Sequence, residues 1–432
     1  MFVSKNLGVN ESGHLTIGGL DTIDIVKDYK TPLYVMDEAL IRENCQSFKT
    51  SINRFYGGNG MICYASKAFC CKEMCRIINE EGMGLDVVSS GELYTAISVG
   101  FPVNRICFHG NNKVEDELTF AIRHGVERIV VDNFSELERI NFLAEKLHKK
   151  VGIMFRIKPG IDAHTHDFVK TGQIDSKFGF ALETGEAFEA VKKSLSFESL
   201  DIRGIHCHIG SQIFEIEPFQ LAAQVMLEFI LKIKNELGYE ITELNLGGGI
   251  GIKYVEADVP LDYENNLEKI LETVKATCDS LKIKQPFIIF EPGRAIVGSA
   301  GITLYKVGSI KEIPNVRTYV AVDGGMGDNP RYALYKSQYD MVIANKADEP
   351  KDFVATVAGK CCESGDLLGE NVSIQKPEAE DILAVLSTGA YNYSMSSNYN
   401  RIAKPAVIMI NKGKVKVAVK RETLDDILKN DI

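Results

Sequence analysis

Lys67 is the side chain whose position most directly suggests chemistry. It follows Met61–Ala65, an apolar run typical of a buried strand, and the segment after it has the apolar spacing of a helix. Lys67 thus lies at the C-terminal end of a strand, where parallel α/β sheets and barrels build their active sites. An apolar wall there would desolvate the amine and make it a nucleophile for a Schiff base. A surface lysine in an ordinary loop is the alternative interpretation.

Other polar or glycine-rich groups also follow apolar runs. They are Asp86, His206 with His208, Gly247–Gly251, and Glu291–Arg294. The glycines would let backbone N–H groups approach a phosphate, because no Cβ stands in the way. The two histidines face the same side of a strand, so they could form a metal pair. No third ligand is evident, and we predict no metal site. His164 and His166 lie in a long loop and are interpreted as solvated.

The elements that must position these groups recur regularly. Eight short apolar runs alternate with amphipathic helical patterns, which predicts βαβ units and a parallel sheet. The runs are Ile62–Ala65, Leu85–Val88, Arg105–Phe108, Arg128–Val131, Gly152–Ile157, Ile202–Ile209, Glu243–Leu246 and Phe287–Phe290. Eight units predict a closed (β/α)8 TIM barrel, with an open doubly wound sheet as the alternative. In a barrel, all the strand-end groups converge at one mouth.

The helical alternation stops after about residue 295. Strand patterns then dominate, at Thr303–Val307, Thr318–Val322, Phe353–Ala358, Asp381–Val385, Ala406–Ile410 and Val415–Val419. We therefore predict a barrel over residues 31–295, followed by a mostly antiparallel β domain formed by residues 1–30 together with 296–432.

Composition limits the class of protein. The 432 residues are 45% hydrophobic and 25% charged, which is typical of a globular protein. The net charge of −10 gives no indication of a nucleic-acid partner. We also expect no membrane partner, because no apolar run approaches the roughly 18 residues of a membrane helix. No secretory signal is visible, and the ten cysteines form no CxxC pair. They are typical of reduced thiols in a cytoplasmic enzyme.

Taken together, the motifs resemble those of the group IV decarboxylases that depend on pyridoxal 5'-phosphate. The resemblance spans nearly the whole chain. It is carried by Tyr64–Ala68, His208–Gln212, Gly247–Gly249, Glu291–Arg294, Val322–Met326, Arg331–Tyr335, Cys362–Asp366, Gly389–Tyr391 and Ser397–Asn400. The chain departs from the family pattern at Tyr332, where proline is usual, and at Lys360-Cys361, where Pro-Leu is more common. Neither change removes a chemical group from the site.

The resemblance implies roles in binding pyridoxal phosphate. Lys67 would hold the cofactor covalently, Glu291 would pair with the pyridine nitrogen, and His208 would stack on the ring. A carboxylate beside that nitrogen keeps it protonated and makes the ring an electron sink. The other predicted cofactor contacts are Asp86, Ser211, Gly248, Gly249, Gly293, Arg294 and Tyr391.

It also implies a substrate with an amino-acid group at each end, which describes meso-2,6-diaminopimelate. Arg294 and Arg331 would bind a carboxylate, and Glu363 would neutralise the distal ammonium. Tyr335 and Tyr391 would add hydroxyl contacts. Cys362 would protonate Cα after CO2 leaves, which would yield L-lysine.

In this family the loop that carries Cys362 and Glu363 comes from the partner subunit, so the resemblance implies a homodimer with shared sites. Alternatives remain within the fold. Ornithine, arginine and carboxynorspermidine decarboxylases differ in how they recognise the distal end of the substrate, and alanine racemase-like enzymes lack two of the motifs. A catalytically silent regulator is a further alternative, although Lys67, Glu291 and Cys362 argue against it.

Overall fold

The computed structural model describes residues 2–161, 176–260 and 262–432, and it divides into two compact units. The barrel unit comprises Asn44–Gly251 and Pro260–Gly293, and the β unit comprises Met1–Glu43, Ile252–Val259 and Arg294–Ile432. The predicted domain limits, 31–295 against 1–30 with 296–432, stay a prediction. His164 and His166 lie outside the described residues.

Eight parallel strands form the barrel, and each corresponds to a predicted apolar run. They are β5 (Gly60–Ala65), β6 (Gly84–Val87), β7 (Ile106–Phe108), β8 (Arg128–Val131), β9 (Val151–Lys158), β11 (Leu200–His206), β12 (Glu243–Asn245) and β13 (Phe287–Phe290). The sheet closes because β13 pairs with β5 and β8 pairs with β9. The short strand β10 (Phe180–Ala181) adds to β9. The predicted closed barrel is confirmed, and the open doubly wound sheet is excluded.

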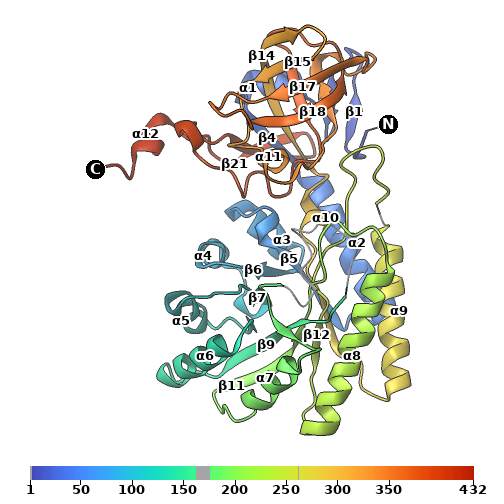
Figure 1. Ribbon diagram of the computed structural model, residues 1–432, viewed down its shortest axis with the longest axis vertical. Coiled ribbons are helices and arrows are strands. Elements are labelled where there is room, and N and C mark those ends of the chain that lie inside the picture. The colour runs from blue at the N-terminus through green and yellow to red at the C-terminus, as the bar shows by residue number, and fades with distance from the viewer. Residues whose placement is uncertain (1, 162–175, 261) are drawn as a thin grey trace. The chain divides into compact units, whose positions relative to one another are not determined.

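Helices cover the outside of the barrel, as Figure 1 shows for α4, α5 and α6. The helices are α3 (Lys72–Glu80), α4 (Ser90–Ile97), α5 (Glu115–His124), α6 (Phe134–Lys146), α7 (Glu186–Ser194), α8 (Glu217–Leu237) and α9 (Tyr263–Leu281), with α2 (Glu38–Tyr56) leading into the unit. Their ends follow local rules. The Asn133 side chain caps α6 by accepting the Glu136 N–H, and Gly125 ends α5 in the left-handed conformation.

The barrel interior is partly apolar, and a buried ion pair lies at the N-terminal ends of its strands. Apolar side chains fill part of the interior, among them Cys63, Cys107, Val130, Met154 and Ile289. At the N-terminal ends of β8 and β12, Arg128 and Glu243 form a buried bidentate ion pair with N–O distances of 2.7 and 2.8 Å. Barrel active sites lie at the opposite mouth, so we assign this pair no part in the chemistry.

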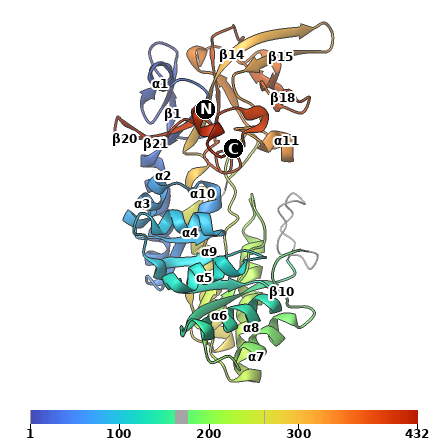
Figure 2. The ribbon, with the colours of Figure 1, turned by 90° about the vertical axis from the view of Figure 1, so that its left-hand side faces the viewer.

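The β unit is a mixed, mostly antiparallel sheet, as predicted. Its main strands run in the order β18 (Leu367–Ile374), β17 (Phe353–Ala358), β15 (Arg317–Val322), β14 (Gly301–Ile313), β4 (Leu33–Asp37), β20 (Ala406–Asn411) and β21 (Lys414–Val419). The long antiparallel pair of β14 and β15 is visible in Figure 2. Beside them, β19 (Ile382–Val385) pairs with β14 and with β16 (Met341–Ile343).

The N-terminal segment supplies the remaining strands of the β unit. These strands form a small sheet of β1 (Leu7–Val9), β2 (Leu15–Ile17) and β3 (Leu20–Asp21). The helices of the whole β unit are α1 (Thr22–Tyr29), α10 (Arg294–Val297), α11 (Arg331–Tyr335) and α12 (Leu424–Leu428). Leu15, Ile17, Leu33 and Val35 are buried in one cluster with Ile408. In the described part of the chain, none of the helices has the length and apolar content needed to cross a membrane.

Candidate active site

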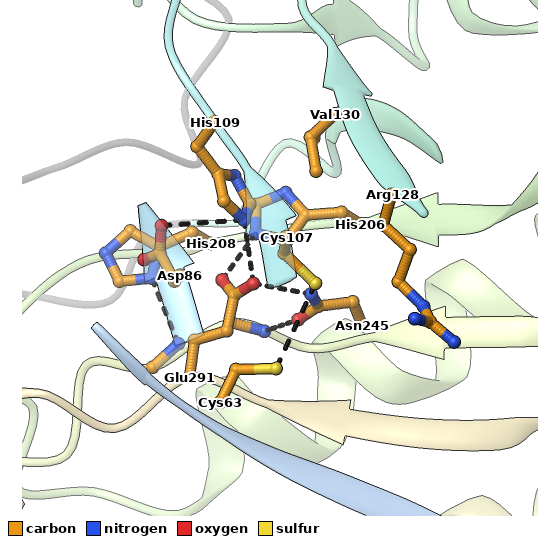
Figure 3. A network of polar contacts seen from close by, with 12 residues as sticks. Cys63, Asp86, Cys107, His109, Arg128, Val130, His206, His208, Asn245 and Glu291 are labelled. Atoms are coloured by element: carbon orange, nitrogen blue, oxygen red, sulfur yellow. Dashed lines mark hydrogen bonds and ion pairs between the residues drawn. The ribbon is translucent and has the colours of Figure 1, made fainter. Parts of the chain in front are cut away.

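The C-terminal ends of the barrel strands bring polar side chains from seven strands to one mouth. Lys67 follows β5, Asp86 lies on β6, His109 follows β7, Arg156 lies on β9, His206 ends β11, Asn245 ends β12 and Glu291 follows β13. These segments are distant in the sequence, and the parallel sheet makes their ends neighbours. Figure 3 shows Asp86, His109, His206, Asn245 and Glu291 in a shared network of polar contacts.

Glu291 is the centre of this network. Its Oε1 atom lies 2.7 Å from His109 Nε2 and 2.6 Å from Asn245 Nδ2, and its Oε2 atom lies 3.1 Å from His206 Nε2 (Figure 3). All four residues are buried. Three side chains from three different strands therefore hold one carboxylate.

The electrostatics of the network favour a charged Glu291. Burial alone would raise the pKa of Glu291, but the contacts with His109 and His206 lower it well below the ordinary carboxyl value. Burial also lowers the pKa of His206 to about 3, so its imidazole is neutral. A neutral ring beside a carboxylate must carry its proton on the facing nitrogen, and His206 Nε2 is therefore the donor.

Asp86 is a second buried carboxyl close to the first. Burial raises the pKa of Asp86, and the charge of Glu291 raises it further. Its Oδ1 atom lies 3.8 Å from His109 Nε2. That Oδ1 atom is buried and has no hydrogen-bond partner among the described residues. Of the two carboxyls, Asp86 is therefore the one that more readily takes up a proton.

His208 lies two residues beyond His206 and makes different contacts. Its Nδ1 atom accepts the Gly248 N–H at 3.2 Å. Burial, followed by the nearby charges of Lys67 and Arg156, lowers the pKa of His208 well below its ordinary value, so the ring is neutral. A phosphate contact from the Gly248 N–H would have to share or replace its bond to His208. Gly248 itself is required by packing, because a Cβ there would lie 2.2 Å from the Glu291 carbonyl oxygen.

Lys67 does not have the environment that we expected. It lies in a single turn of 3-10 helix, Ser66–Ala68, where its two neighbours are buried and Lys67 itself is exposed. The Lys67 side chain is therefore open to solvent and is not desolvated in the way that we expected. Its charge nevertheless lies close enough to His208 to contribute to the lowered pKa of that ring. Its electrostatic neighbours include Asp86 and Glu92, and burial raises the pKa of Glu92 to about 7.

The β unit contains a separate cluster of two arginines around one tyrosine. The Tyr254 hydroxyl accepts from Arg294 Nη1 at 2.5 Å and from Arg331 Nη1 at 3.2 Å. The Tyr391 ring lies 4.7 Å from Arg294 Cζ and 5.3 Å from Arg331 Cζ. The Tyr335 ring lies 5.9 Å from Arg331 Cζ. Four residues that we predicted to contact the substrate are thus brought together, with Tyr254 among them.

This arginine–tyrosine cluster is strongly electropositive. Both arginines are buried. Burial alone would raise the pKa of Tyr254, but Arg294 and Arg331 outweigh that effect and lower it. Two buried guanidinium groups with one hydroxyl acceptor can bind a carboxylate through charge-assisted hydrogen bonds.

Cys362 and Glu363 lie on an exposed loop of the β unit. The Cys362 N–H donates to Asn400 Oδ1 at 2.7 Å, and the Tyr399 hydroxyl donates to Glu363 Oε2 at 3.5 Å. Asp366 anchors the base of the loop by accepting the Cys361 N–H at 2.7 Å. The loop is therefore held in shape while both side chains that we predicted to act on substrate face solvent.

Known proteins with this architecture place the chain in a family. A model of the pyridoxal-dependent decarboxylase, pyridoxal binding domain, matches residues 38–298. The diaminopimelate decarboxylase of Bacillus methanolicus is 49% identical, covering 98% of both chains. That of Bacillus subtilis (strain 168) is 48% identical over 100% of this chain and 98% of its own. This chain belongs to the diaminopimelate decarboxylase family. The crystal structure of diaminopimelate decarboxylase from m. jannaschii in co-complex with L-lysine is also similar. It superimposes with a TM-score of 0.92 at 34% identity, covering 100% of this chain and 99% of the other.

The residues of this family member fit pyridoxal phosphate, the cofactor of the family. A carboxylate has about four acceptor positions, and described side chains use three of those on Glu291. The fourth can accept the N–H of a protonated pyridine ring. The buried Oδ1 of Asp86, which has no hydrogen-bond partner among the described residues, is an atom that a bound molecule can satisfy.

The same decarboxylase network contains a set of potential metal ligands. Ligand atoms of His109, His206 and Glu291 all lie within 4.8 Å of one another. This set differs from the pair of His206 with His208 that the sequence spacing allowed. The Oε1 atom of Glu291 also accepts from Asn245, and the measured distances are those of hydrogen bonds. We therefore interpret the cluster as a hydrogen-bonded carboxylate in the decarboxylase site.

Four residues near these family sites were missed by the sequence analysis. His109 and Asn245 contact Glu291, Arg156 is an electrostatic neighbour of Glu291, and Tyr254 bridges the two arginines. His109 directly follows a predicted strand, so the strand-end rule could have found it. Asn245 was counted as part of a strand. Tyr254 lies in a segment without a strand or helix pattern, and nothing local marks it.

Proposed function

We propose that this family member uses pyridoxal phosphate to convert meso-2,6-diaminopimelate to L-lysine and CO2, the last step of lysine biosynthesis. The observation that carries the substrate assignment is the buried pair Arg294 and Arg331 around Tyr254. An ornithine-like substrate has no distal carboxylate for such a pair. The full-length similarity to diaminopimelate decarboxylases supports the same substrate, as does the L-lysine bound in the related structure.

The barrel unit would hold the cofactor. Bound pyridoxal phosphate supplies an electron sink for the charge that develops at Cα when CO2 departs. Lys67 would attach the cofactor, the neutral ring of His208 would pack on its face, and Glu291 would hold a proton on the ring nitrogen. The proposed contacts to phosphate or ring come from the residues predicted above, namely Asp86, Ser211, Gly248, Gly249, Gly293, Arg294 and Tyr391.

The β unit would recognise the substrate. Arg294 and Arg331 would bind the distal carboxylate, because a planar guanidinium can donate two parallel hydrogen bonds to it. Tyr335 and Tyr391 would add hydroxyl contacts, and Glu363 would pair with the distal ammonium. Cys362 would donate its thiol proton to Cα after decarboxylation, a general-acid role that cysteine can fill.

The exposure of Cys362 and Glu363 supports a shared site. An acid and an ion-pair partner surrounded by water would be weak, because water screens charge and competes for the proton. A partner subunit that covers the loop would remove that water. We therefore propose a homodimer in which each subunit lends Cys362 and Glu363 to the other. We also propose a cytoplasmic location, because all ten cysteines are free thiols.

A CO2-release assay tests the proposed function directly. The purified protein would be supplied with meso-diaminopimelate, ornithine, arginine, lysine and carboxynorspermidine in parallel. We expect release from meso-diaminopimelate to exceed that from each other substrate by orders of magnitude. Faster release from a substrate without a distal carboxylate would overturn the assignment of the two arginines.

Substitution of Glu363 separates substrate binding from loop support. Glu363→Gln keeps the size and removes the charge that would neutralise the distal ammonium. We expect KM for meso-diaminopimelate to rise and kcat/KM to fall roughly 10–100-fold, with the visible absorbance of the cofactor unchanged. If kcat falls while KM stays constant, Glu363 only supports the loop that carries Cys362.

Substitution of Tyr254 tests the arginine–tyrosine cluster. Tyr254→Phe removes the hydroxyl that both arginines share, so their guanidinium groups lose a common anchor. Because a hydrogen bond to a charged group contributes about 1.5–3 kcal/mol, we expect KM for meso-diaminopimelate to rise roughly tenfold or more with kcat little changed. Tyr332→Phe is the matched control, since its hydroxyl donates to Glu370 instead. A lower KM in Tyr254→Phe would instead mean that the hydroxyl competes with the substrate carboxylate.

A further inference from the structure

Glu291 could pair with the protonated ring nitrogen of the cofactor without help from other side chains, yet three of them contact its carboxylate. Three donors converge on its carboxylate, His109 after β7, His206 at the end of β11 and Asn245 at the end of β12. No contact with cofactor or substrate was assigned to the three donors themselves. Each comes from a different strand, so the barrel must be closed before the carboxylate is surrounded.

The donors make the ionised form of Glu291 tolerable inside the barrel. A buried carboxylate without partners would take up a proton, because loss of water penalises the charge. Hydrogen bonds to the charged form oppose that penalty, and three side-chain donors contact this one carboxylate. The direction of the pKa shift of Glu291 agrees, since it is lowered despite complete burial.

The state of His206 is consistent with a fixed donor. Its Nδ1 atom is buried and has no hydrogen-bond partner among the described residues. A proton on that nitrogen would be buried without an acceptor, which is costly. The proton of the neutral ring therefore belongs on Nε2, and that atom faces Glu291 Oε2 at 3.1 Å. The neutral His206 ring therefore donates a hydrogen bond to Glu291 and does not transfer its proton to the carboxylate.

The other charged groups that face the network do not reverse this arrangement. Arg156 on β9 and Lys67 after β5 are positive, and both stabilise negative charge at Asp86. Asp86 on β6 is the competing carboxyl, and burial and Glu291 both raise its pKa. When two neighbouring carboxyls have environments that separate their pKa values, one remains charged and the other holds the proton. Here Glu291 remains charged.

We propose that His109, His206 and Asn245 are positioning residues that keep Glu291 a weak base, so that the proton between Glu291 and the cofactor ring stays on the ring nitrogen. This inference rests on the proposed role of Glu291 at that nitrogen. A shared proton resides on the more basic partner, and each donor lowers the basicity of the carboxylate. Loss of a donor should move the proton toward Glu291 and weaken the electron sink.

The test compares two substitutions at each histidine in the holoenzyme, reconstituted with pyridoxal phosphate labelled with 15N in the ring. His206→Leu and His109→Leu remove the donor, whereas His206→Gln and His109→Gln retain an amide N–H near the position of Nε2. We expect the 15N chemical shift to move toward the unprotonated value in both leucine variants and to stay near the wild-type value in both glutamine variants. The leucine variants should lose kcat roughly 10–100-fold, with KM little changed. His124→Gln, an exposed histidine on α5, is the control and should match the wild type.

A second measurement does not depend on the reaction. In the apoenzyme with 13C-labelled glutamate, the pKa of the Glu291 carboxyl should rise by about one to two units when either histidine becomes leucine. An unchanged carboxyl pKa in a folded leucine variant would overturn the proposal, even if activity fell. If the carboxyl pKa rises but the ring shift stays constant in every variant, the role of Glu291 at the ring nitrogen is wrong, and the proposal fails with it. If one leucine variant does not fold, the other decides between these results.

Discussion

The Lys67→Ala variant is expected to lose the visible absorbance of bound pyridoxal phosphate and to lose activity by roughly 10³-fold or more. Covalent attachment holds the cofactor at an effective concentration that free binding cannot reach, and the substitution removes the amine that would form the link. Because Lys67 is exposed and lies in a short turn after β5, the barrel should fold without it. Absorbance spectra and the CO2-release assay check both parts.

The matched control for Lys67→Ala is Lys72→Ala. Lys72 is exposed at the start of α3, five residues further along the chain. It should keep both absorbance and activity. A Lys67→Ala variant that remains yellow and active would place the covalent link elsewhere.

The second large effect concerns Cys362. Cys362→Ala should lower kcat by roughly 10²–10⁴-fold, the usual contribution of a positioned general acid. If sites are shared, each site takes Lys67 from one subunit and Cys362 from the other. The two variants therefore damage contributions from different subunits. Mixing equal amounts of the two inactive chains would give heterodimers in which one of the two sites is intact. After full exchange, we expect about a quarter of wild-type activity, because about half of the dimers would be mixed.

This experiment requires proof that subunits exchange. Mass spectrometry of differently labelled chains provides it, and Cys361→Ala is the matched control, since Cys361 is buried while Cys362 is exposed. Verified heterodimers without activity would mean that one chain builds the whole site. The proposed shared loop would then be withdrawn, while the assignment of the cofactor residues would stand.

Local patterns in the sequence were sufficient to predict the architecture of the barrel. Each predicted run became a strand because a buried parallel strand needs a short, nearly continuous apolar segment. Lys67, Asp86 and Glu291 could be found as candidates because strand ends converge in a barrel whatever the side chains are. In the β unit, β18 and β16 were not predicted, since polar residues such as Glu370 interrupt the apolar pattern of β18 and β16 has only three residues.

The sequence by itself therefore determined the barrel, the strand order within it, and the residue types at its active mouth. Only the tertiary structure decided which of those residues touch. His109 and Glu291 are separated by 182 positions, and Asn245 and Glu291 by 46, so their hydrogen bonds follow from barrel closure rather than local spacing. In the β unit, the Tyr254 hydroxyl meets Arg331 across 77 positions, which local spacing could not predict either. Burial makes His206 neutral, whereas the side chains around Glu291 keep that residue charged despite its burial, and both effects exist only once the chain has folded.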